Sequence, residues 1–191
     1  MFSNKAKVSF GIPLKLKLYL FMSKFYKQKN DITFSMDKPK DIRKGEDLPR
    51  DPLKKFLTSQ GFNTKDLNIK QFPSGYSNLT YFLSTNNNEY VLRRPPFGAD
   101  SLKGGHDMSR EYKVLSKLKA EFKKVPNVYL YTEDKSIIGA PFYIMDCVKG
   151  YIMRPNLSQE NAPDADTVST IADSLIDTLV HFHQVHTYNS A

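Results

Sequence analysis

Short runs of apolar and β-branched residues, separated by turn residues, dominate the chain between residues 68 and 94. The runs at 68–72, 79–84 and 89–94 are rich in residues that favour strands, and apolar positions in them alternate with polar ones. Between the runs lie Pro73-Ser74-Gly75 and Asn86-Asn87-Asn88, which are typical turn sequences. The pattern therefore predicts three consecutive antiparallel strands in a meander.

A different period, in which apolar residues recur every three or four positions, predicts three helices. The first covers residues 51–60 and ends at Gly61. The second begins after Asp107, a residue suited to capping a helix start, and carries an apolar face made of Met108, Tyr112, Leu115 and Leu118. The third covers residues 165–186, with an apolar stripe formed by Val168, Ile171, Leu175, Leu179 and Phe182.

Two further strand-like runs, at 128–132 and 142–148, flank a turn-rich segment. The complete order is helix, three strands, helix, two strands, linker and long helix. This order favours the α+β class, with a five-stranded antiparallel sheet that carries a helix. We expect a basic N-terminal extension at 1–38, the sheet domain at 39–150, and a linker with the last helix at 151–191.

The composition fits a globular chain with an ordinary core. Of 191 residues, 40% are hydrophobic and 25% are charged, and no charge-free apolar run is long enough to suggest a membrane span. The single cysteine, Cys147, excludes an internal disulfide framework and a cysteine-based zinc cluster. It favours a reducing compartment, and we expect a cytoplasmic or mitochondrial protein.

The net charge of +8 lies mainly in the first 30 residues. This segment holds seven of the 28 basic residues and no acidic residue, so the rest of the chain is nearly neutral. Because a nucleic-acid surface needs clustered excess positive charge, we do not expect the folded part to bind nucleic acid. The mixture of lysine and leucine in residues 1–30 leaves three interpretations open: an unstructured leader, a mitochondrial presequence, or a segment that contacts a membrane surface.

Three strands, a helix and two more strands form the layout of a protein-kinase small lobe. In that fold a glycine-containing turn covers the nucleotide phosphates, a strand cation neutralises them, and a helix glutamate holds the cation. The sequence Ser-Gly-Tyr-Ser-Asn at 74–78 occupies the turn between the first two strands. Alternation along the third strand places Arg93 on the face of Val91, and Glu111 lies near the start of the next helix. We therefore predict that Arg93 and Glu111 form the pair.

Four stretches in order, "QFPSGYSNLTYFL", "YVLRRPPFG", "HDMSREYKVLSKL" and "IIGAPFYIMDCVKG", resemble motifs of the aminoglycoside/choline-kinase-like phosphotransferases. The similarity extends from Leu53 to His186. It is to the branch that stands alone in bacteria or forms the N-terminal phosphotransferase domain of acyl-CoA dehydrogenase family members 10 and 11. The resemblance implies ATP-dependent phosphoryl transfer to a hydroxyl, which in the fused relatives belongs to a 4-hydroxyacyl-CoA.

The resemblance also implies seven nucleotide-binding positions. Three of them, Gly75, Ser77 and Asn78, match the phosphate-covering loop. Arg93 matches the strand cation that other kinases supply as lysine, and Glu111 matches its helix partner. Backbone groups of Asp146 and Val148 match the segment that meets the adenine edge. Tyr76 departs from the family pattern, in which a smaller or polar residue is common, and its ring would crowd the loop.

The sequence contains no His-Gly-Asp loop, which in this family supplies the catalytic carboxylate ahead of the Asn and Asp that hold magnesium. We therefore predict no catalytic and no metal-binding residue in these 191 residues. We expect a truncated enzyme, in which ATP, magnesium and a small-molecule acceptor would meet only in a longer chain.

Three hypotheses stay open. The chain is the nucleotide-binding part of a longer phosphotransferase, or a non-catalytic nucleotide-binding or regulatory module, or a protein that associates with membrane or nucleic acid through its lysine-rich segment. The apolar stripe of the 165–186 helix further predicts aggregation or oligomerisation, because large side chains left in water cost free energy.

Overall fold

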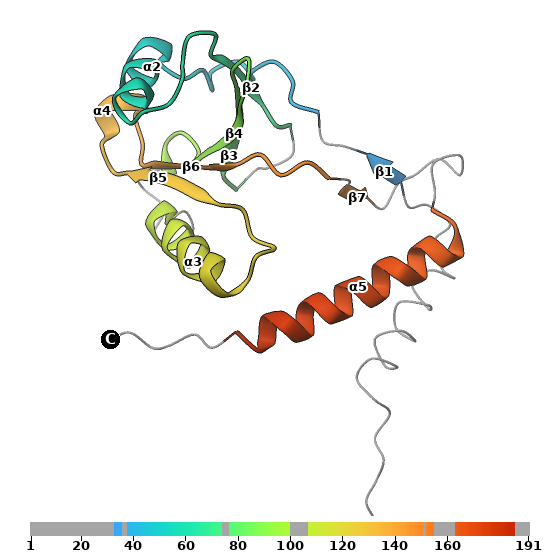
Figure 1. Ribbon diagram of the computed structural model, residues 1–191. Helices are drawn as coiled ribbons and strands as arrows, with labels where there is room; N and C mark the ends of the chain where they lie inside the picture. Colours follow the sequence, from blue (N-terminus) through green and yellow to red (C-terminus); the bar gives the residue numbers. More distant parts are fainter. Residues whose placement is uncertain are drawn as a thin grey trace, which may run out of the picture. The chain divides into compact units, whose positions relative to one another are not determined.

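A computed structural model describes residues 33–35, 38–73, 77–99, 107–150, 152–154 and 163–185. The chain divides into two compact units, one covering Met36–Tyr151 and the other combining Met1–Ser35 with Ile152–Ala191. The first unit contains a five-stranded antiparallel sheet, and the second contains a two-stranded sheet and a long helix (Figure 1).

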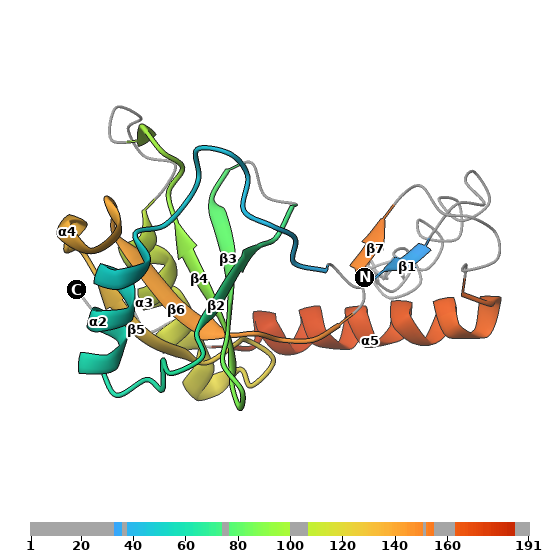
Figure 2. The ribbon, with the colours of Figure 1, turned by 90° about the horizontal axis from the view of Figure 1, so that it is seen from above.

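The five-stranded sheet is built from β2 (Asn68–Gln71), β3 (Leu79–Ser84), β4 (Glu89–Arg94), β5 (Val128–Thr132) and β6 (Phe142–Asp146). The spatial order is β2-β3-β4-β6-β5, and every neighbouring pair is antiparallel (Figure 2). The predicted meander is therefore confirmed. Strand β6, although last in sequence among these strands, lies between β4 and β5 in the sheet. It ends at Asp146, two residues before the predicted end at residue 148.

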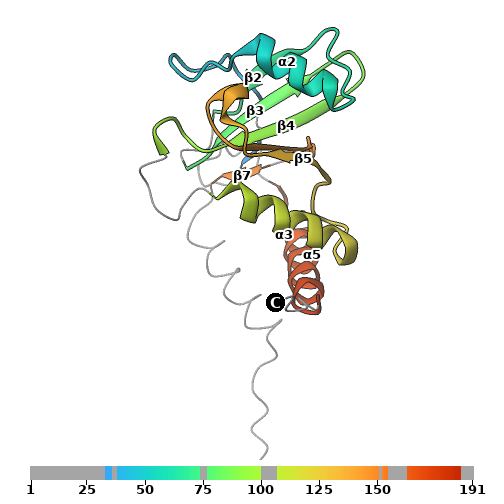
Figure 3. The same cartoon turned by 90° about the vertical axis from the view of Figure 1, so that its left-hand side faces the viewer.

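Helices cover both faces of this sheet (Figures 1 and 3). Helix α2 (Arg50–Ser59) and the short helix α4 (Lys135–Ile138) lie on one face, and α3 (Met108–Glu121) packs against β5 and β6 on the other. Alternation along the strands divides the side chains between the two faces. The main core lies under α2 and α4, and its largest members include Leu53, Leu57, Tyr81, Leu92, Ile138 and Phe142.

Local signals explain where the helices begin and end. The Asp107 carboxylate accepts a hydrogen bond of 2.9 Å from the Arg110 N–H, so the predicted N-cap of α3 is confirmed. Gly61, directly after the C-cap of α2, has a φ of +85°, a left-handed conformation that glycine adopts without strain. Gly139 ends α4, also in a left-handed conformation. This four-residue helix was not predicted, because its segment was expected to form a turn.

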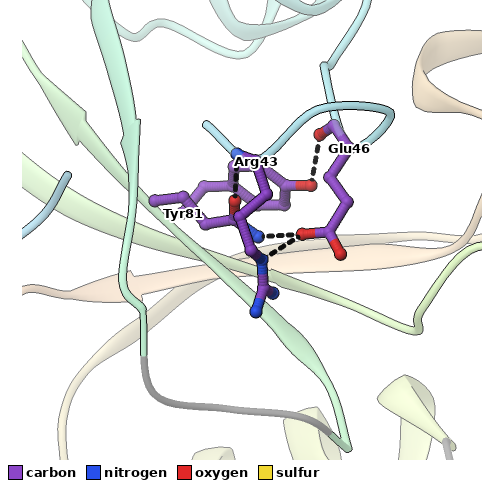
Figure 4. Close-up of polar contacts among 4 residues, drawn as sticks. Arg43, Glu46 and Tyr81 are labelled. Carbon is purple, nitrogen blue, oxygen red and sulfur yellow. Dashed lines mark hydrogen bonds and ion pairs between the residues drawn. The ribbon is translucent and has the colours of Figure 1, made fainter. Parts of the chain in front are cut away.

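The segment before α2 is bound to the edge of the sheet (Figure 4). Lys40 pairs with Gln71 as an isolated bridge, and the Arg43 N–H donates to the Gln71 side-chain oxygen at 2.9 Å. The Glu46 carboxylate accepts hydrogen bonds from Nε of Arg43, at 2.8 Å, and from the amide nitrogen of Gln71. On the backbone, Glu46 O accepts from the Tyr81 hydroxyl at 2.6 Å. These bonds attach the entry segment to β2 and β3, the strands that precede and follow the predicted phosphate-covering loop.

In the second unit, β1 (Thr33–Ser35) pairs antiparallel with β7 (Ile152–Arg154), and α5 covers Ala165–His183. The two strands were not predicted, whereas the helix was. Asp164 caps α5 by accepting a 2.7 Å hydrogen bond from the Thr167 N–H.

Residues 1–30, to which the predictions of a leader, a presequence or a membrane contact refer, lie outside the described residues. No helix within the described ranges combines the length and apolar character needed to cross a bilayer.

Candidate functional site

The side chains of Arg93 and Glu111 meet on the α3 side of the sheet. Nη2 of Arg93, on β4, lies 3.5 Å from Oε2 of Glu111, in the first turn of α3. The two side chains are 31% and 34% exposed, so solvent or a ligand can reach both. The pairing predicted from strand alternation and helix position therefore exists, and its role toward a nucleotide stays a prediction.

The guanidinium of Arg93 has unused donor capacity. An arginine carries five N–H donors, and the one protein contact of this guanidinium among the described residues is the ion pair with Glu111. Its Nε is buried and has no hydrogen-bond partner within the described part of the chain. A buried donor without an acceptor is costly, so the surroundings of Arg93 favour an added anion.

The Glu111 carboxylate has two more partners. Its Oε1 accepts a 2.9 Å hydrogen bond from Nδ2 of Asn78, and its Oε2 accepts one of 2.9 Å from the Tyr143 hydroxyl. Tyr143 lies on β6 directly opposite Arg93 on β4, and its side chain is almost completely buried. We did not predict a role for Tyr143, although alternation along β6 places it on the face of the sheet that α3 covers.

Burial raises the pKa of the Tyr143 phenol above its ordinary value, and the nearby Glu111 carboxylate raises it further, while Arg93 acts in the opposite direction. The hydroxyl therefore keeps its proton throughout the physiological pH range. Tyr143 is a permanent hydrogen-bond donor to Glu111.

Arg94, the next residue along β4, serves a different purpose. It is 2% exposed, and its guanidinium donates to the carbonyl oxygens of Pro95, at 3.0 Å, and Ile138, at 2.9 Å. The same group lies 3.8 Å from the centre of the Phe97 ring. Arg94 is thus held within the protein, on the face of the sheet opposite Arg93.

The segment after β6 was predicted to meet the adenine edge through Asp146 and Val148. The Asp146 N–H donates to Asn127 O at 2.9 Å, so an adenine contact at Asp146 would have to use its carbonyl oxygen. Burial would raise the pKa of the Asp146 carboxyl, but hydrogen bonds from Tyr129 and Asn127 outweigh burial and hold the pKa below its usual range. Val148 follows the strand and is exposed.

The phosphate-covering loop is described in part. Gly75, with Ser74 and Tyr76, lies outside the described residues, so its predicted role is not tested. Ser77 is exposed, and Asn78 is buried with its side chain directed to Glu111. Among the residues that the structure describes, no three His, Cys, Asp or Glu side chains gather in a way that could hold a metal ion.

The arrangement of Arg93 and Glu111 is suited to binding an anion in a defined orientation. A partly exposed guanidinium is anchored on one side by a carboxylate, and its remaining donors can form charge-assisted hydrogen bonds to phosphate oxygens. The donors of Arg93 that Glu111 leaves unused fit an anionic group such as a phosphate.

The chain is similar to several known proteins. Acyl-CoA dehydrogenase family member 11 of Gallus gallus is 37% identical over 117 residues, which are 61% of this chain and 14% of that protein. Acyl-CoA dehydrogenase family member 10 of Mus musculus is 35% identical over 115 residues, which are 59% of this chain and 11% of that protein. The chain therefore spans a small part of the length of these relatives.

A crystal structure described as that of an aminoglycoside phosphotransferase from Ralstonia eutropha JMP134 is 34% identical in sequence. The match covers 55% of this chain and 29% of that one, with a TM-score of 0.46. The family model described as "Phosphotransferase enzyme family" matches residues 68–191, which is more than half of the chain. The five-stranded antiparallel sheet and its helices are thus a kinase-like small lobe, and the chain belongs to the phosphotransferase enzyme family.

Proposed function

We propose that this chain binds ATP and supplies the nucleotide side of phosphoryl transfer to the hydroxyl of a small molecule. The observation that carries the proposal is the guanidinium of Arg93, which Glu111 anchors and whose buried Nε has no acceptor among the described residues. Arg93 would contact the α and β phosphates of ATP, as the strand cation of kinase-like lobes does. Arginine adds to this charge a planar set of donors that matches phosphate oxygens.

The adenine would lie against the segment that follows β6. The Asp146 carbonyl oxygen and the backbone of the exposed residue Val148 are the groups that we assign to its polar edge. Ser77 and the backbone of Gly75 and Asn78 would close over the phosphates from the loop between β2 and β3. Bound magnesium would neutralise the charge of the transferred phosphate, and its ligands would come from motifs that are not among these 191 residues.

For the acceptor we propose the hydroxyl of a hydroxyacyl-CoA. The support is the similarity to acyl-CoA dehydrogenase family members 10 and 11. Because the sequence lacks a His-Gly-Asp loop, we expect these 191 residues to bind ATP without transferring its phosphate. A non-catalytic nucleotide-binding or regulatory role is the alternative. The two differ when the chain is joined to a lobe that carries the missing motif, because only the first then predicts transfer.

Isothermal titration calorimetry with Mg-ATP on the 191-residue chain tests nucleotide binding. We expect Arg93→Ala to weaken binding at least about tenfold, because a hydrogen bond to a charged group contributes about 1.5 to 3 kcal/mol. Arg110→Ala is the matched control, since Arg110 is an exposed arginine next to Glu111, and its removal should change affinity less than about twofold. A folded wild-type chain that does not bind, or an Arg93→Ala variant that binds normally, would refute the proposal.

The compartment that we propose is the cytoplasm or the mitochondrion, on the basis of the single cysteine and the lysine-rich residues 1–30. A fluorescent protein fused behind residues 1–38 distinguishes the two. Mitochondrial import of this fusion supports the presequence interpretation, and a diffuse signal contradicts it.

A further inference from the structure

The Glu111 carboxylate contacts residues on two strands of the sheet and one residue at the entrance to a third strand. Asn78, which directly precedes β3, donates to Oε1, and Tyr143 on β6 donates to Oε2. Arg93 on β4 places Nη2 3.5 Å from Oε2. The strands follow one another in the sheet in the order β3-β4-β6, and α3 crosses the same face (Figure 3). One carboxylate thus gathers groups from the loop, the central strand and the strand that leads to the adenine segment.

We propose that Tyr143 and Asn78 are positioning residues that hold the Glu111 carboxylate in the orientation from which it directs Arg93 toward the phosphates of a nucleotide. This inference rests on the function proposed above and assigns roles that act through Glu111. Neither residue needs to touch the nucleotide with its side chain.

The geometry explains why Arg93 depends on these bonds. The last torsion of a glutamate side chain is broad, so a carboxylate that is one third exposed can rotate freely unless hydrogen bonds hold it. Here both oxygens are held, one by Asn78 just before β3 and the other by Tyr143 on β6, and this fixes the plane of the carboxylate. The contact from Arg93 is an ion pair of 3.5 Å without a short hydrogen bond. The position of the guanidinium therefore follows the position of the negative charge.

Asn78 adds a link to the loop. It directly precedes β3, at the end of the segment that was predicted to cover the phosphates, and its side chain is buried on Glu111. A displacement of the loop end therefore acts on the same carboxylate that orients Arg93.

The first test is a double-mutant cycle that uses ADP, which carries both phosphates assigned to Arg93. Tyr143→Phe keeps the buried ring and removes the hydroxyl, and we expect it to weaken ADP binding about threefold to tenfold. In the Arg93→Ala background the same change should alter affinity less than about twofold, because the group that Tyr143 positions is gone. An equal loss in both backgrounds would mean that Tyr143 supports the fold in general, and would overturn the inference.

Tyr81→Phe is the matched control. Tyr81 is also a buried tyrosine of this sheet, and its hydroxyl donates to the backbone oxygen of Glu46 (Figure 4). It belongs to the core under α2, on the face opposite Tyr143. The Tyr81→Phe change removes this hydroxyl and should lower the stability of the fold without changing the affinity for ADP. If Tyr81→Phe weakens ADP binding as much as Tyr143→Phe does, the specific role of Tyr143 is refuted.

The second test needs no nucleotide and so separates this inference from the proposed function. In the ligand-free protein, the buried Nε–H of Arg93 should give a nitrogen-15 NMR signal that exchanges slowly with water and is missing in Arg93→Lys. Tyr143→Phe and Asn78→Ala should each accelerate its exchange, and Tyr81→Phe should not. If ADP does not bind to the wild type, the proposed function fails. The exchange rate of the Arg93 Nε–H signal then tests the positioning roles of Tyr143 and Asn78 by itself. Unchanged exchange in both variants overturns the inference.

Discussion

Arg93 and Arg94 are adjacent in the sequence, yet their guanidinium groups lie on opposite faces of β4 and have opposite surroundings. Arg93 is 31% exposed and pairs with Glu111, whereas Arg94 is 2% exposed and donates to two backbone carbonyl oxygens. A strand turns successive side chains to opposite faces, so one strand end supplies both a partly exposed cation and a buried structural one.

This difference predicts opposite effects on stability and binding. Arg94→Ala should destabilise the fold by about 2 to 4 kcal/mol, because it leaves the Ile138 and Pro95 oxygens without their donor and creates a cavity. Arg93→Ala should cost less than about 1 kcal/mol, since its ion pair is partly exposed. Urea denaturation followed by circular dichroism measures both. Equal stability of the two variants would contradict the division of roles.

The bonds around Glu46 predict a second effect on stability. Glu46→Ala removes the acceptor of Nε of Arg43 and of the amide of Gln71, and the Gln71 side chain is buried. We expect a loss of about 1 to 3 kcal/mol, because a buried amide then lacks its partner. Glu121→Ala, at an exposed position near the end of α3, is the control and should stay within about 0.5 kcal/mol of the wild type. Similar unfolding midpoints for both variants would argue against this network.

The buried hydroxyl of Tyr81 predicts a dependence of stability on alkaline pH. Burial raises the pKa of Tyr81 from its ordinary value of 10.0 to about 12. The positive charge of Arg94 lowers this pKa, and the negative charge of Glu46 raises it. The folded state therefore favours the protonated phenol. Its contribution to stability is complete below about pH 10 and is lost as the pH rises toward about 12. Urea titrations between pH 8 and 11.5 should show a steeper loss of stability for the wild type than for Tyr81→Phe, and parallel curves would refute the assignment.

The N-cap of α3 predicts a local effect on Glu111. Asp107→Ala removes the hydrogen bond to the Arg110 N–H and should cost about 1 kcal/mol. Asp107→Asn keeps an acceptor at the same place and should retain most of that stability. Amide hydrogen exchange at Arg110 and Glu111 reports fraying of this turn directly. Faster exchange in the alanine variant than in the asparagine variant is the expected result, and equal exchange would show that another contact fixes the turn.

The exposed apolar residues of α5 predict self-association. Leu175, Leu179 and Phe182 are exposed in the structure. Burying such side chains against a second copy would gain free energy in proportion to the apolar area removed from water. We expect sedimentation velocity to detect oligomers that grow with concentration. Leu175→Lys with Leu179→Lys should reduce them, whereas Val114→Lys, at an exposed apolar position on α3, should not. A wild-type chain that stays monomeric at all concentrations would contradict this prediction.

Strand alternation and capping signals were sufficient to predict most of the first unit. The meander, the cap at Asp107 and the choice of Arg93 over Arg94 depend on local periods that are visible in a single sequence. The contacts of Glu111 with Asn78 and Tyr143 could not be predicted in the same way. They depend on which strands become neighbours, and strand order is set by the packing of the whole domain.

Other features were missed for related reasons. The strands β1 and β7 are three residues each and lie far apart along the chain, so neither gives a local signal. On α5 the burial of Ile176 was not predicted, whereas Leu175, Leu179 and Phe182 of the predicted stripe are exposed, as the prediction of self-association requires. A helical period identifies an apolar side of a helix, but the surroundings of the helix decide which of its residues are buried.

The position of β6 in the sheet has a consequence for how the protein folds. The strands β2, β3 and β4 pair with their neighbours in sequence, which requires the closure of short turns alone. The β4–β6 pairing instead joins distant segments, after the chain has passed through α3 and β5, and closing such a long loop is slow. Tyr143 arrives opposite Arg93 only in this late pairing. We therefore expect the meander to form early in folding and the cluster around Glu111 to form later, when β6 pairs with β4.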